Sequence, residues 1–540
     1  MGWNYGDILD GVDAVVPGDR PALIHGGGVT TWADFTSRTN NLAAQLRARG
    51  AQPGDKVAIY MRNRAAYMET LVACFKARLV QVNVNFRYLD AELEYIFDNS
   101  DARFAVFSSE FREHVSALRG RLPKLEHWIE VTEEGADCLE FATPFEELAE
   151  SGDGTPLGIE RSPHDLLFIY TGGTTGMPKG VMWEAEALWG ALGFGANQPA
   201  NLGEKPASVE QHVANVKAFG AGPRQIPACP LMHGTGLLTA IGTISGGGCV
   251  VTLEGEHFDP VELFDAIDRD AADSIVIVGD AFAKPMLTCL DENPGRWSLA
   301  SLKMVVSSGV MWSREVKQGL LKHHAGMMLV DTFGSSEAVG FGTSVTTAAG
   351  ETGTAKFQIG DSCKVFTEDH REVEPGSGER GFIARRGPIP AGYYKDEKKS
   401  AETFPTIDGV LYSIPGDWCT VEADGTLTLL GRGSVCINTA GEKVYPEEVE
   451  EALKRHAAVE DALVVGLADD KWGQAVTAVV ELQGSASFDE AELRAFVKGE
   501  LAGYKAPKRV FVTEKMFRAP NGKADYKSAR EYAERALASD

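Results

Sequence analysis

The sequence has little positive charge for its length. Its 540 residues include 52 lysines and arginines against 77 aspartates and glutamates, which gives a net charge of −25. An excess of negative charge argues against nucleic acid or an anionic membrane as a bulk partner. We therefore expect no nucleic-acid binding, and an anionic small molecule would need a local basic site that opposes the overall field.

Cysteine pairs and long apolar runs are also missing. The eight cysteines show no CxxC spacing and most lie in apolar stretches such as Leu71–Phe75, which predicts reduced core residues of a cytoplasmic protein. Glycines interrupt the uncharged run Gly234–Leu253, which predicts a buried helix, a turn and a strand. Met1–Val16 carries three aspartates and no basic residue, unlike a signal peptide. We expect no integral membrane segment.

What the sequence does have is a dense run of glycine, threonine and lysine. The apolar residues Leu166–Ile169 predict a buried strand, and Thr171–Gly180 then holds four glycines, three threonines and Lys179. Closely spaced glycines let backbone N–H groups approach a ligand, and a lysine adds mobile positive charge. Lys179 precedes Gly180, so the order differs from that of the common P-loop. The run predicts a phosphate-binding loop, with a flexible surface loop as the plainer alternative.

Residues 31–107 alternate between helical and strand-like patterns. Such alternation predicts a parallel, doubly wound sheet covered by helices, with ligands beyond the carboxyl ends of the strands. Further along the chain, three predicted apolar strands are each followed by a short polar turn. This pattern indicates that the ends of these three strands share one cleft. The strands predicted in residues 31–107 are Lys56–Met61, Leu79–Val84 and Arg103–Phe107, and the helices are Thr31–Arg49, Ala65–Lys76 and Asp90–Asn99.

The pattern changes from about residue 361, where short strand-like pieces with Gly, Pro and Asp turns predict a β-rich subdomain. Gly431–Gly433 is the predicted linker, and beyond it lie about a hundred residues with mixed helix and strand patterns, a usual domain size. We therefore predict an α/β fold. Residues 1–431 form a large N-terminal domain of doubly wound sheets plus the β-rich subdomain, and residues 432–540 form a small, mobile α+β C-terminal domain.

Seven short motifs occur along the chain in an order that resembles one family. The order is similar to that of the adenylate-forming enzymes, which include acyl-CoA synthetases, luciferase-like enzymes and peptide-synthetase adenylation domains. Each motif alone is a modest signal, but all of them in sequence are a strong one. The motifs are Tyr170–Gly180, Pro230–Gly236, Ser307–Met311, Phe333–Glu337, Pro415–Asp417, Gly431–Arg432 with Gly441–Glu450, and Pro520–Lys523.

Other segments narrow the resemblance within that family. Asn83–Tyr88 and Gly392–Lys399 resemble the actinobacterial ligases that join cholesterol side-chain acids to CoA, and their fatty-acyl relatives. The sequence departs from the broader family at the hinge, where Ser434 replaces a common acidic residue. It also departs at Phe333 and Ser336, which replace a tyrosine and a threonine. These departures suit the steroid-acid branch.

The resemblance implies a reaction in two steps with ATP, Mg²⁺ and coenzyme A. A carboxylate attacks the α-phosphorus of ATP to give acyl-AMP and pyrophosphate, and the thiol of CoA then displaces AMP. Such transfers require mainly positioning and charge neutralisation. The implied partners are ATP, CoA and a bulky hydrophobic carboxylic acid, either a steroid side-chain acid or a medium- to long-chain fatty acid. A homodimer is a further family-level expectation.

The resemblance also implies roles for single residues. Lys523 would stabilise charge in the adenylation transition state, Glu337 would hold Mg²⁺, and Ser336 would contact the α-phosphate. His233 would flank the acyl carboxylate, and a rotation of the C-terminal domain would replace Lys523 by the Gly441–Lys443 turn for the CoA step. The residues implied for pyrophosphate are Thr171, Gly172, Gly173, Thr174, Thr175, Gly176 and Lys179; for adenine, Ser308, Gly309 and Asp331; for ribose, Asp417 and Arg432; for CoA, Gly441 and Lys443.

Plainer interpretations accompany these roles. A lone histidine such as His233 is more often structural than functional, and lysines such as Lys443 and Lys523 are often solvated surface residues. Three other functions also stay open: an adenylation enzyme that loads a carrier protein, a luciferase-like oxygenase, and a nucleotide-binding protein without catalysis. The presence of Lys179, Glu337 and Lys523 together disfavours the last of these.

Overall fold

The computed structural model divides the chain into two compact units. Unit 1 comprises Met1–Thr354 and Arg385–Ser413, and unit 2 comprises Ala355–Ala384 and Ile414–Asp540. The predicted domain boundary between residues 431 and 432 stays a prediction. The structure describes residues 2–88, 90–133, 135–173, 176–193, 206–220, 222–310, 312–350, 356–432, 437–439, 442–469, 473–484, 486–501, 503–519 and 522–539.

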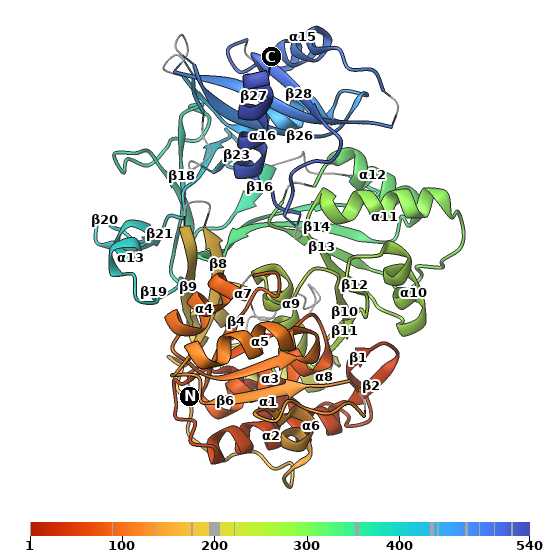
Figure 1. Cartoon of the computed structure of the whole chain (residues 1–540), viewed down its shortest axis with the longest axis vertical. Coiled ribbons are helices and arrows are strands. Elements are labelled where there is room, and N and C mark those ends of the chain that lie inside the picture. The colour runs from red at the N-terminus through yellow and green to blue at the C-terminus, as the bar shows by residue number, and fades with distance from the viewer. Residues whose placement is uncertain are drawn as a thin grey trace. The chain divides into compact units, whose positions relative to one another are not determined.

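One sheet of unit 1 contains the predicted alternation of strands and helices (Figure 1). Its strand order is β19-β9-β8-β4-β3-β5-β6-β7, and the neighbours from β8 to β7 run parallel. The α/β fold with a doubly wound sheet is thereby confirmed. The strands are β3 (Lys56–Tyr60), β4 (Val80–Asn83), β5 (Ala102–Ser108), β6 (His127–Val131), β7 (Thr143–Pro144), β8 (Leu166–Gly173), β9 (Gly176–Glu184) and β19 (Gly392–Tyr393).

A second sheet of unit 1 has the order β2-β1-β11-β10-β12-β13-β14-β15. Strands β1, β11, β10, β12, β13 and β14 run parallel, so the turns that follow them lie at the same edge. The strands are β1 (Pro21–His25), β2 (Gly28–Thr31), β10 (Arg224–Pro227), β11 (Cys249–Thr252), β12 (Ser274–Ile277), β13 (Met304–Ser308), β14 (Met328–Ser335) and β15 (Ala338–Thr346); β20 (Thr406–Ile407) and β21 (Val410–Ser413) form a small hairpin.

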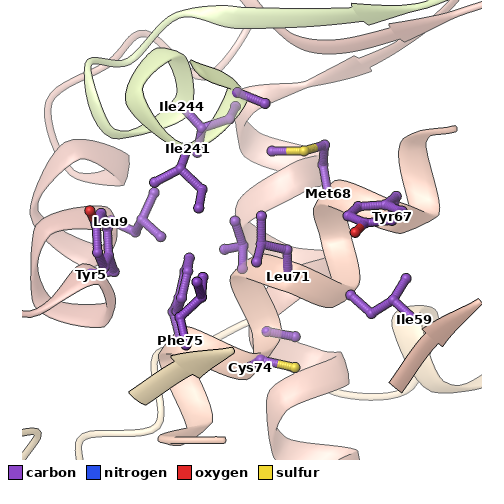
Figure 2. Packing of buried hydrophobic residues seen from close by; sticks show 14 of the residues in the cluster. Tyr5, Leu9, Ile59, Tyr67, Met68, Leu71, Cys74, Phe75, Ile241 and Ile244 are labelled. Atoms are coloured by element: carbon purple, nitrogen blue, oxygen red, sulfur yellow. The ribbon is translucent and has the colours of Figure 1, made fainter. Parts of the chain in front are cut away.

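Helix α3 (Ala65–Ala77) belongs to one of the apolar core clusters of unit 1. Every residue after Ala65 is buried, as expected for a helix whose many apolar residues are spread over all of its sides. Figure 2 shows its Leu71 and Phe75 packed against Leu9 of α1 and Ile241 of α9. The helices of unit 1 are α1 (Tyr5–Asp13), α2 (Trp32–Ala48), α3, α4 (Asp90–Asn99), α5 (Arg112–Leu118), α6 (Phe145–Glu150), α7 (Ala185–Leu192), α8 (Val209–Phe219), α9 (Gly234–Ser245), α10 (Pro260–Asp270), α11 (Asp280–Glu292), α12 (Arg314–His323) and α13 (Glu397–Thr403).

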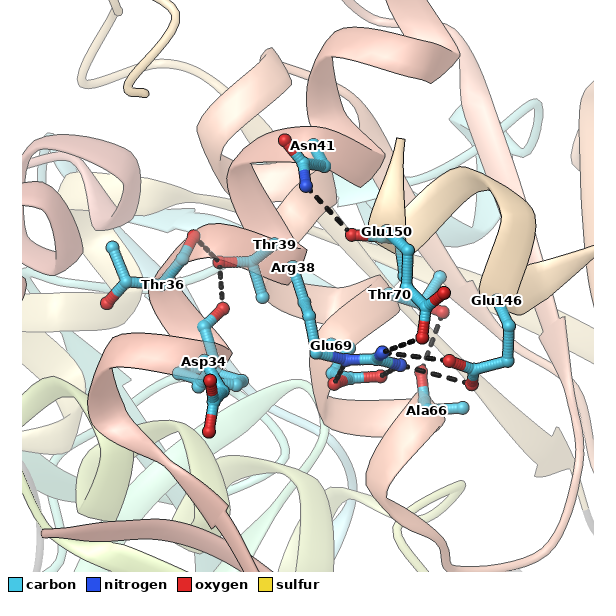
Figure 3. Close-up of polar contacts among 12 residues, drawn as sticks. Asp34, Thr36, Arg38, Thr39, Asn41, Ala66, Glu69, Thr70, Glu146 and Glu150 are labelled. Atoms are coloured by element: carbon cyan, nitrogen blue, oxygen red, sulfur yellow. Dashed lines mark hydrogen bonds and ion pairs between the residues drawn. The ribbon is translucent and has the colours of Figure 1, made fainter. Parts of the chain in front are cut away.

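The polar side chains of α3 are paired inside the protein. Arg38 of α2 donates to Glu69 of α3 (Nη2–Oε2, 3.1 Å) and to Glu146 of α6 (Nη1–Oε2, 2.8 Å), as Figure 3 shows. Lys76 donates to Asp13 of α1 over 2.7 Å. Because an unpaired buried charge destabilises a fold strongly, these pairs stabilise the packing of α3 against α1 and α2, and Arg38 also ties α2 to α6.

Unit 2 combines short antiparallel strands with a small α+β sheet of order β25-β24-β27-β26, to which β28 adds parallel to β27. Its apolar core includes Leu453 of α14 and Val464 of β26. The elements are β16 (Lys356–Ile359), β17 (Cys363–Phe366), β22 (Asp417–Val421), β23 (Leu427–Arg432), β24 (Ile437–Thr439), β25 (Glu442–Val444), α14 (Pro446–Lys454), β26 (Val459–Asp469), β27 (Gly473–Leu482), α15 (Glu490–Glu500), β28 (Arg509–Thr513) and α16 (Tyr526–Ser539); β18 (Arg380–Arg386) begins in unit 2 and ends in unit 1.

The uncharged run Gly234–Leu253 forms helix α9, a glycine turn and strand β11, as predicted. Among the described residues, no helix combines the length and the apolar character needed to cross a membrane.

Candidate active site

The glycine-rich run forms the end of a β-hairpin. Strand β8 leads into it and β9 returns, with Thr171 opposite Lys179 and Gly173 opposite Gly176. Thr174 and Thr175 lie outside the described residues. Gly172 belongs to β8. The hairpin brings the threonine of one strand and the lysine of the other side by side, which is a suitable arrangement for a phosphate.

Lys179 forms an ion pair with Asp396, and both side chains are partly exposed. Asp396 also caps helix α13, because its Oδ1 accepts a hydrogen bond from the Lys399 N–H over 3.0 Å. The ammonium of Lys179 holds the pKa of Asp396 below its ordinary value. The charge of Lys179 is thus balanced by a carboxylate, which a phosphate group can replace.

His233 immediately precedes helix α9. The turn before it is fixed by Asn63, whose Nδ2 donates to the Cys229 carbonyl (3.0 Å) and whose Oδ1 accepts from the Leu231 N–H (2.7 Å). The first turn of α9 starts at His233, whose carbonyl accepts a hydrogen bond from the Leu237 N–H. His233 therefore sits at the amino end of a helix, where the backbone dipole favours negative groups.

Ser336 and Glu337 occupy the turn between β14 and β15. Trp183 of β9 donates its indole N–H to the Ser336 carbonyl over 2.8 Å, so the turn is tied to the hairpin strand. Tyr393 donates its hydroxyl to Glu337 Oε1 over 2.9 Å. A Cβ atom placed on Gly234 would lie 3.7 Å from Ser336 Oγ. The structure thus brings this turn, the hairpin strand β9 and the start of α9 together.

The residues implied for adenine lie on neighbouring parallel strands. Ser308 pairs with Thr332, next to Asp331, across β13 and β14. Gly309 has a φ of 89°, a left-handed conformation that favours glycine. Lys317 of α12 donates to Asp331 Oδ2 over 3.1 Å. Burial nevertheless raises the pKa of Asp331 to about 6, since desolvation outweighs the attraction of Lys317.

Unit 2 carries the remaining predicted residues. Asp417 begins strand β22, is buried, and pairs in register with Arg432 at the end of β23. The side chain of Arg432 lies outside the described residues, as does Gly441. Lys443 belongs to β25 and pairs with Asn438, and its side chain is likewise not described. The position of Asp417 is therefore the part of the predicted ribose site that the structure describes.

Lys523 has an exposed side chain on the returning arm of a tight turn. The Ala519 N–H donates to the Lys523 carbonyl over 2.8 Å, and Arg518 bridges to Ala524. Arg518 in turn binds both carboxylate oxygens of Asp461, with Nη2 2.6 Å from Oδ1. A two-pronged ion pair of this kind fixes geometry as well as charge. The turn that presents Lys523 is therefore anchored to strand β26.

Glu337 is the carboxylate that the sequence predicts as the metal ligand of this site. The described residues contain no group of three or more His, Cys, Asp or Glu side chains that could hold a metal by themselves. Glu337 is buried and held by Tyr393, a single oriented carboxylate. That donor set fits Mg²⁺, which uses one or two carboxylates beside substrate phosphates. Zinc and calcium prefer fuller protein cages.

Asp396, Tyr393 and Lys317 contact predicted site residues but were not themselves predicted. The first two lie in Gly392–Lys399, the segment that resembles the steroid-acid branch. That resemblance is the feature of the sequence that could have indicated them. Lys317 is one of two lysines in α12, and nothing in the sequence distinguished it as a site residue.

Comparisons with known proteins cover nearly the whole chain. The family model described as AMP-binding enzyme matches residues 12–394, and that of the AMP-binding enzyme C-terminal domain matches residues 448–523. The 3-oxocholest-4-en-26-oate–CoA ligase of Rhodococcus rhodochrous is 40% identical over 98% of this chain and 96% of its own. The medium/long-chain-fatty-acid–CoA/3-oxocholest-4-en-26-oate–CoA ligase of Mycobacterium tuberculosis is 41% identical over 99% of this chain and 97% of its own.

Solved structures share the fold at lower identity. The anthranilate CoA ligase AuaEII in complex with anthranoyl-AMP aligns with a TM-score of 0.85 at 21% identity, covering 100% of this chain and 98% of its own. ATP-bound MatB from Rhodopseudomonas palustris aligns with a TM-score of 0.81 at 22% identity, covering 98% and 99%. With a family model that matches more than half of its length and relatives similar from end to end, this chain belongs to the AMP-binding enzymes.

Proposed function

We propose that this protein is an AMP-forming acyl-CoA ligase that acts on a bulky hydrophobic carboxylic acid. The observation that carries the proposal is the end-to-end similarity to CoA ligases, at about two-fifths identity, which includes the C-terminal region. Those relatives are named for a steroid side-chain acid and for medium- and long-chain fatty acids. The proposed substrates are the same two classes of acid, together with ATP and CoA.

In the proposed first half-reaction, the β8–β9 hairpin binds the phosphates of ATP. Lys179 exchanges Asp396 for the β- and γ-phosphates, and Thr171 lies opposite it in the hairpin. Glu337 would hold Mg²⁺, which neutralises phosphate charge when it is bound. His233 and the amino end of α9 attract the acyl carboxylate, and Ser336 contacts the α-phosphate. The carboxylate oxygen then bonds to the α-phosphorus as pyrophosphate leaves.

Nucleoside binding and the second half-reaction are assigned to further residues. Ser308, Gly309 and Asp331 line the adenine, and Asp417 with Arg432 binds the ribose. Lys523 stabilises the charge that develops during adenylation. A rotation of residues 432–540 then brings Gly441 and Lys443 to the CoA site, where the thiol displaces AMP. The division at residue 431, a homodimeric state and a cytoplasmic location remain predictions.

The test is pyrophosphate release with ATP and Mg²⁺, measured with and without CoA. The acids would range from acetate through octanoate and hexadecanoate to steroid side-chain acids. CoA-dependent release, with formation of the matching acyl-CoA, is the expected result for steroid or longer fatty acids. Pyrophosphate release that does not depend on CoA would favour the alternative function, an enzyme that loads another acceptor such as a carrier protein. No release with any acid would overturn it.

A further inference from the structure

Asn83 is the last residue of strand β4 and is buried, with 3% of its surface exposed. Its carboxamide makes three hydrogen bonds to the backbone. Oδ1 accepts from the Tyr170 N–H (2.7 Å), and Nδ2 donates to the Tyr170 carbonyl (3.1 Å) and to the Met232 carbonyl (2.6 Å). Tyr170 precedes the glycine-rich run, and Met232 precedes His233. One side chain therefore contacts both of these segments.

The geometry explains why an asparagine stands here. Strands β4 and β8 pair in parallel at Val82 and Phe168. Beyond that pair, the carboxamide of Asn83 offers Tyr170 one donor and one acceptor, as a peptide group of a neighbouring strand would. Its second N–H remains for Met232. Only a primary amide provides two donors and an acceptor at this length, whereas a carboxylate provides acceptors alone.

The segment that follows Asn83 holds Met232 at a second point. The Phe86 N–H donates to Met232 Sδ over 3.3 Å, and Met232 is fully buried. The chain that leaves β4 thus fixes both ends of this residue, its carbonyl and its thioether. His233, one residue further on, has its backbone position set relative to β4 and, through Asn83, relative to β8.

We infer that Asn83 is a positioning residue that sets the spacing between the phosphate-binding hairpin and His233. This inference rests on the proposed function, in which the hairpin holds ATP and His233 flanks the acyl carboxylate. Adenylation requires the carboxylate and the α-phosphorus to approach in a fixed geometry. A single rigid link between the two binding elements supplies that geometry before either substrate arrives, and substrate-positioning groups of this kind contribute strongly to rate.

Asn41 provides a matched control within the same unit. It is 5% exposed and also links backbone segments, with Nδ2 donating to the Ala149 carbonyl (3.0 Å) and Oδ1 accepting from the Gly154 N–H (2.9 Å). It lies on α2, where Figure 3 shows it beside the end of α6. Neither Ala149 nor Gly154, its hydrogen-bond partners among the described residues, is a proposed site residue. Replacing asparagine by aspartate at either position removes the amide N–H donors and keeps the shape of the side chain.

The experiment compares Asn83→Asp with Asn41→Asp and the wild type in thermal unfolding and in acyl-CoA formation. For Asn83→Asp we expect kcat/KM to fall about a hundredfold for ATP and for the acid together, with Asn41→Asp within about twofold of the wild type. Both variants should lose stability, Asn83→Asp more than Asn41→Asp, because it loses two donated hydrogen bonds rather than one. If Asn83→Asp is destabilised but keeps its kinetic constants, the inference is overturned.

Two further measurements distinguish a failure of the inference from misfolding of the variant and from a failure of the proposed function. If Asn83→Asp does not fold, Asn83→Ser serves instead, because a hydroxyl can still accept from Tyr170 but is too short to link both segments; wild-type kinetics for it would overturn the inference. If the wild type forms no acyl-CoA, the proposed function fails. ATP binding by calorimetry then still tests Asn83, and equal affinity in Asn83→Asp and Asn41→Asp would count against it.

Discussion

Lys179 and Asp396 form an ion pair across 217 residues of sequence. One residue belongs to the glycine-rich hairpin and the other caps helix α13. The pair neutralises the charge of Lys179 before a ligand binds. An incoming phosphate must therefore displace a carboxylate, and this exchange can be tested directly.

Asp396→Asn should tighten ATP binding. Asparagine caps a helix as well as aspartate does, so α13 is preserved while the competing charge is removed. We expect the dissociation constant of ATP to fall about two- to fivefold, since partly exposed ion pairs contribute up to about 1 kcal/mol. Calorimetry with ATP measures it, and Asp153→Asn, in an exposed turn, controls for the loss of one negative charge. Weaker binding would show instead that Asp396 orients Lys179 for the phosphate.

The buried Asp331 should make stability depend on pH. Its pKa is raised from 3.8 to about 6, so between these values the unfolded chain releases its proton before the folded chain does. The favourable contribution is present below pH 3.8 and is lost as pH rises towards 6. Relative to Asp331→Asn, the wild type should lose about 2 to 3 kcal/mol of stability between pH 4 and pH 7. Urea denaturation of both proteins measures the difference, and parallel pH curves would contradict it.

Lys523→Ala should separate the two half-reactions. Acyl-AMP formation from acid and ATP should fall about a hundredfold or more, as expected when a group that stabilises transition-state charge is removed. Thioester formation from supplied acyl-AMP should be unchanged. Lys515→Ala, a nearby exposed lysine, is the control. Survival of both half-reactions in Lys523→Ala would make its assignment wrong.

Arg518→Lys should reproduce this selectivity in a weaker form. Lysine keeps the charge opposite Asp461 but cannot bind both carboxylate oxygens, so the turn that carries Lys523 loses its fixed orientation. We expect adenylation to slow about tenfold while thioester formation from acyl-AMP is retained. Arg455→Lys, in an exposed pair with Glu500, is the control. An equal loss in both half-reactions would point to general destabilisation of unit 2.

Local sequence patterns predicted helices and strands well where the spacing of apolar residues and the residues at the ends of an element agree. The predicted helix Thr31–Arg49 is α2 (Trp32–Ala48), because its apolar residues recur at helical spacing; in the structure, Thr31 is its N-cap. The glycine-rich run is a β-hairpin rather than an open loop. Its glycines have low strand propensity and concealed the pairing, which depends on the neighbouring strands.

The site was predicted in part. Ser308 and Asp331 lie on adjacent strands, as motifs at the ends of parallel strands should. The partners of site residues were not predicted: Tyr393 meets Glu337, and Asp396 meets Lys179, only through the tertiary fold. No periodicity links positions so far apart, so a single sequence carries no local signal for such pairs.

Gly180 and Tyr170 face each other in the hairpin, and a Cβ atom on Gly180 would come within 2.9 Å of the tyrosine ring. The ring cannot move aside, because its hydroxyl donates to Asn99 over 2.7 Å and it is buried. The two positions therefore constrain each other in any library of variants. A side chain at position 180 is therefore tolerated only in variants that lack the ring at position 170. Recombined variants that carry both a side chain at position 180 and Tyr170 should be inactive.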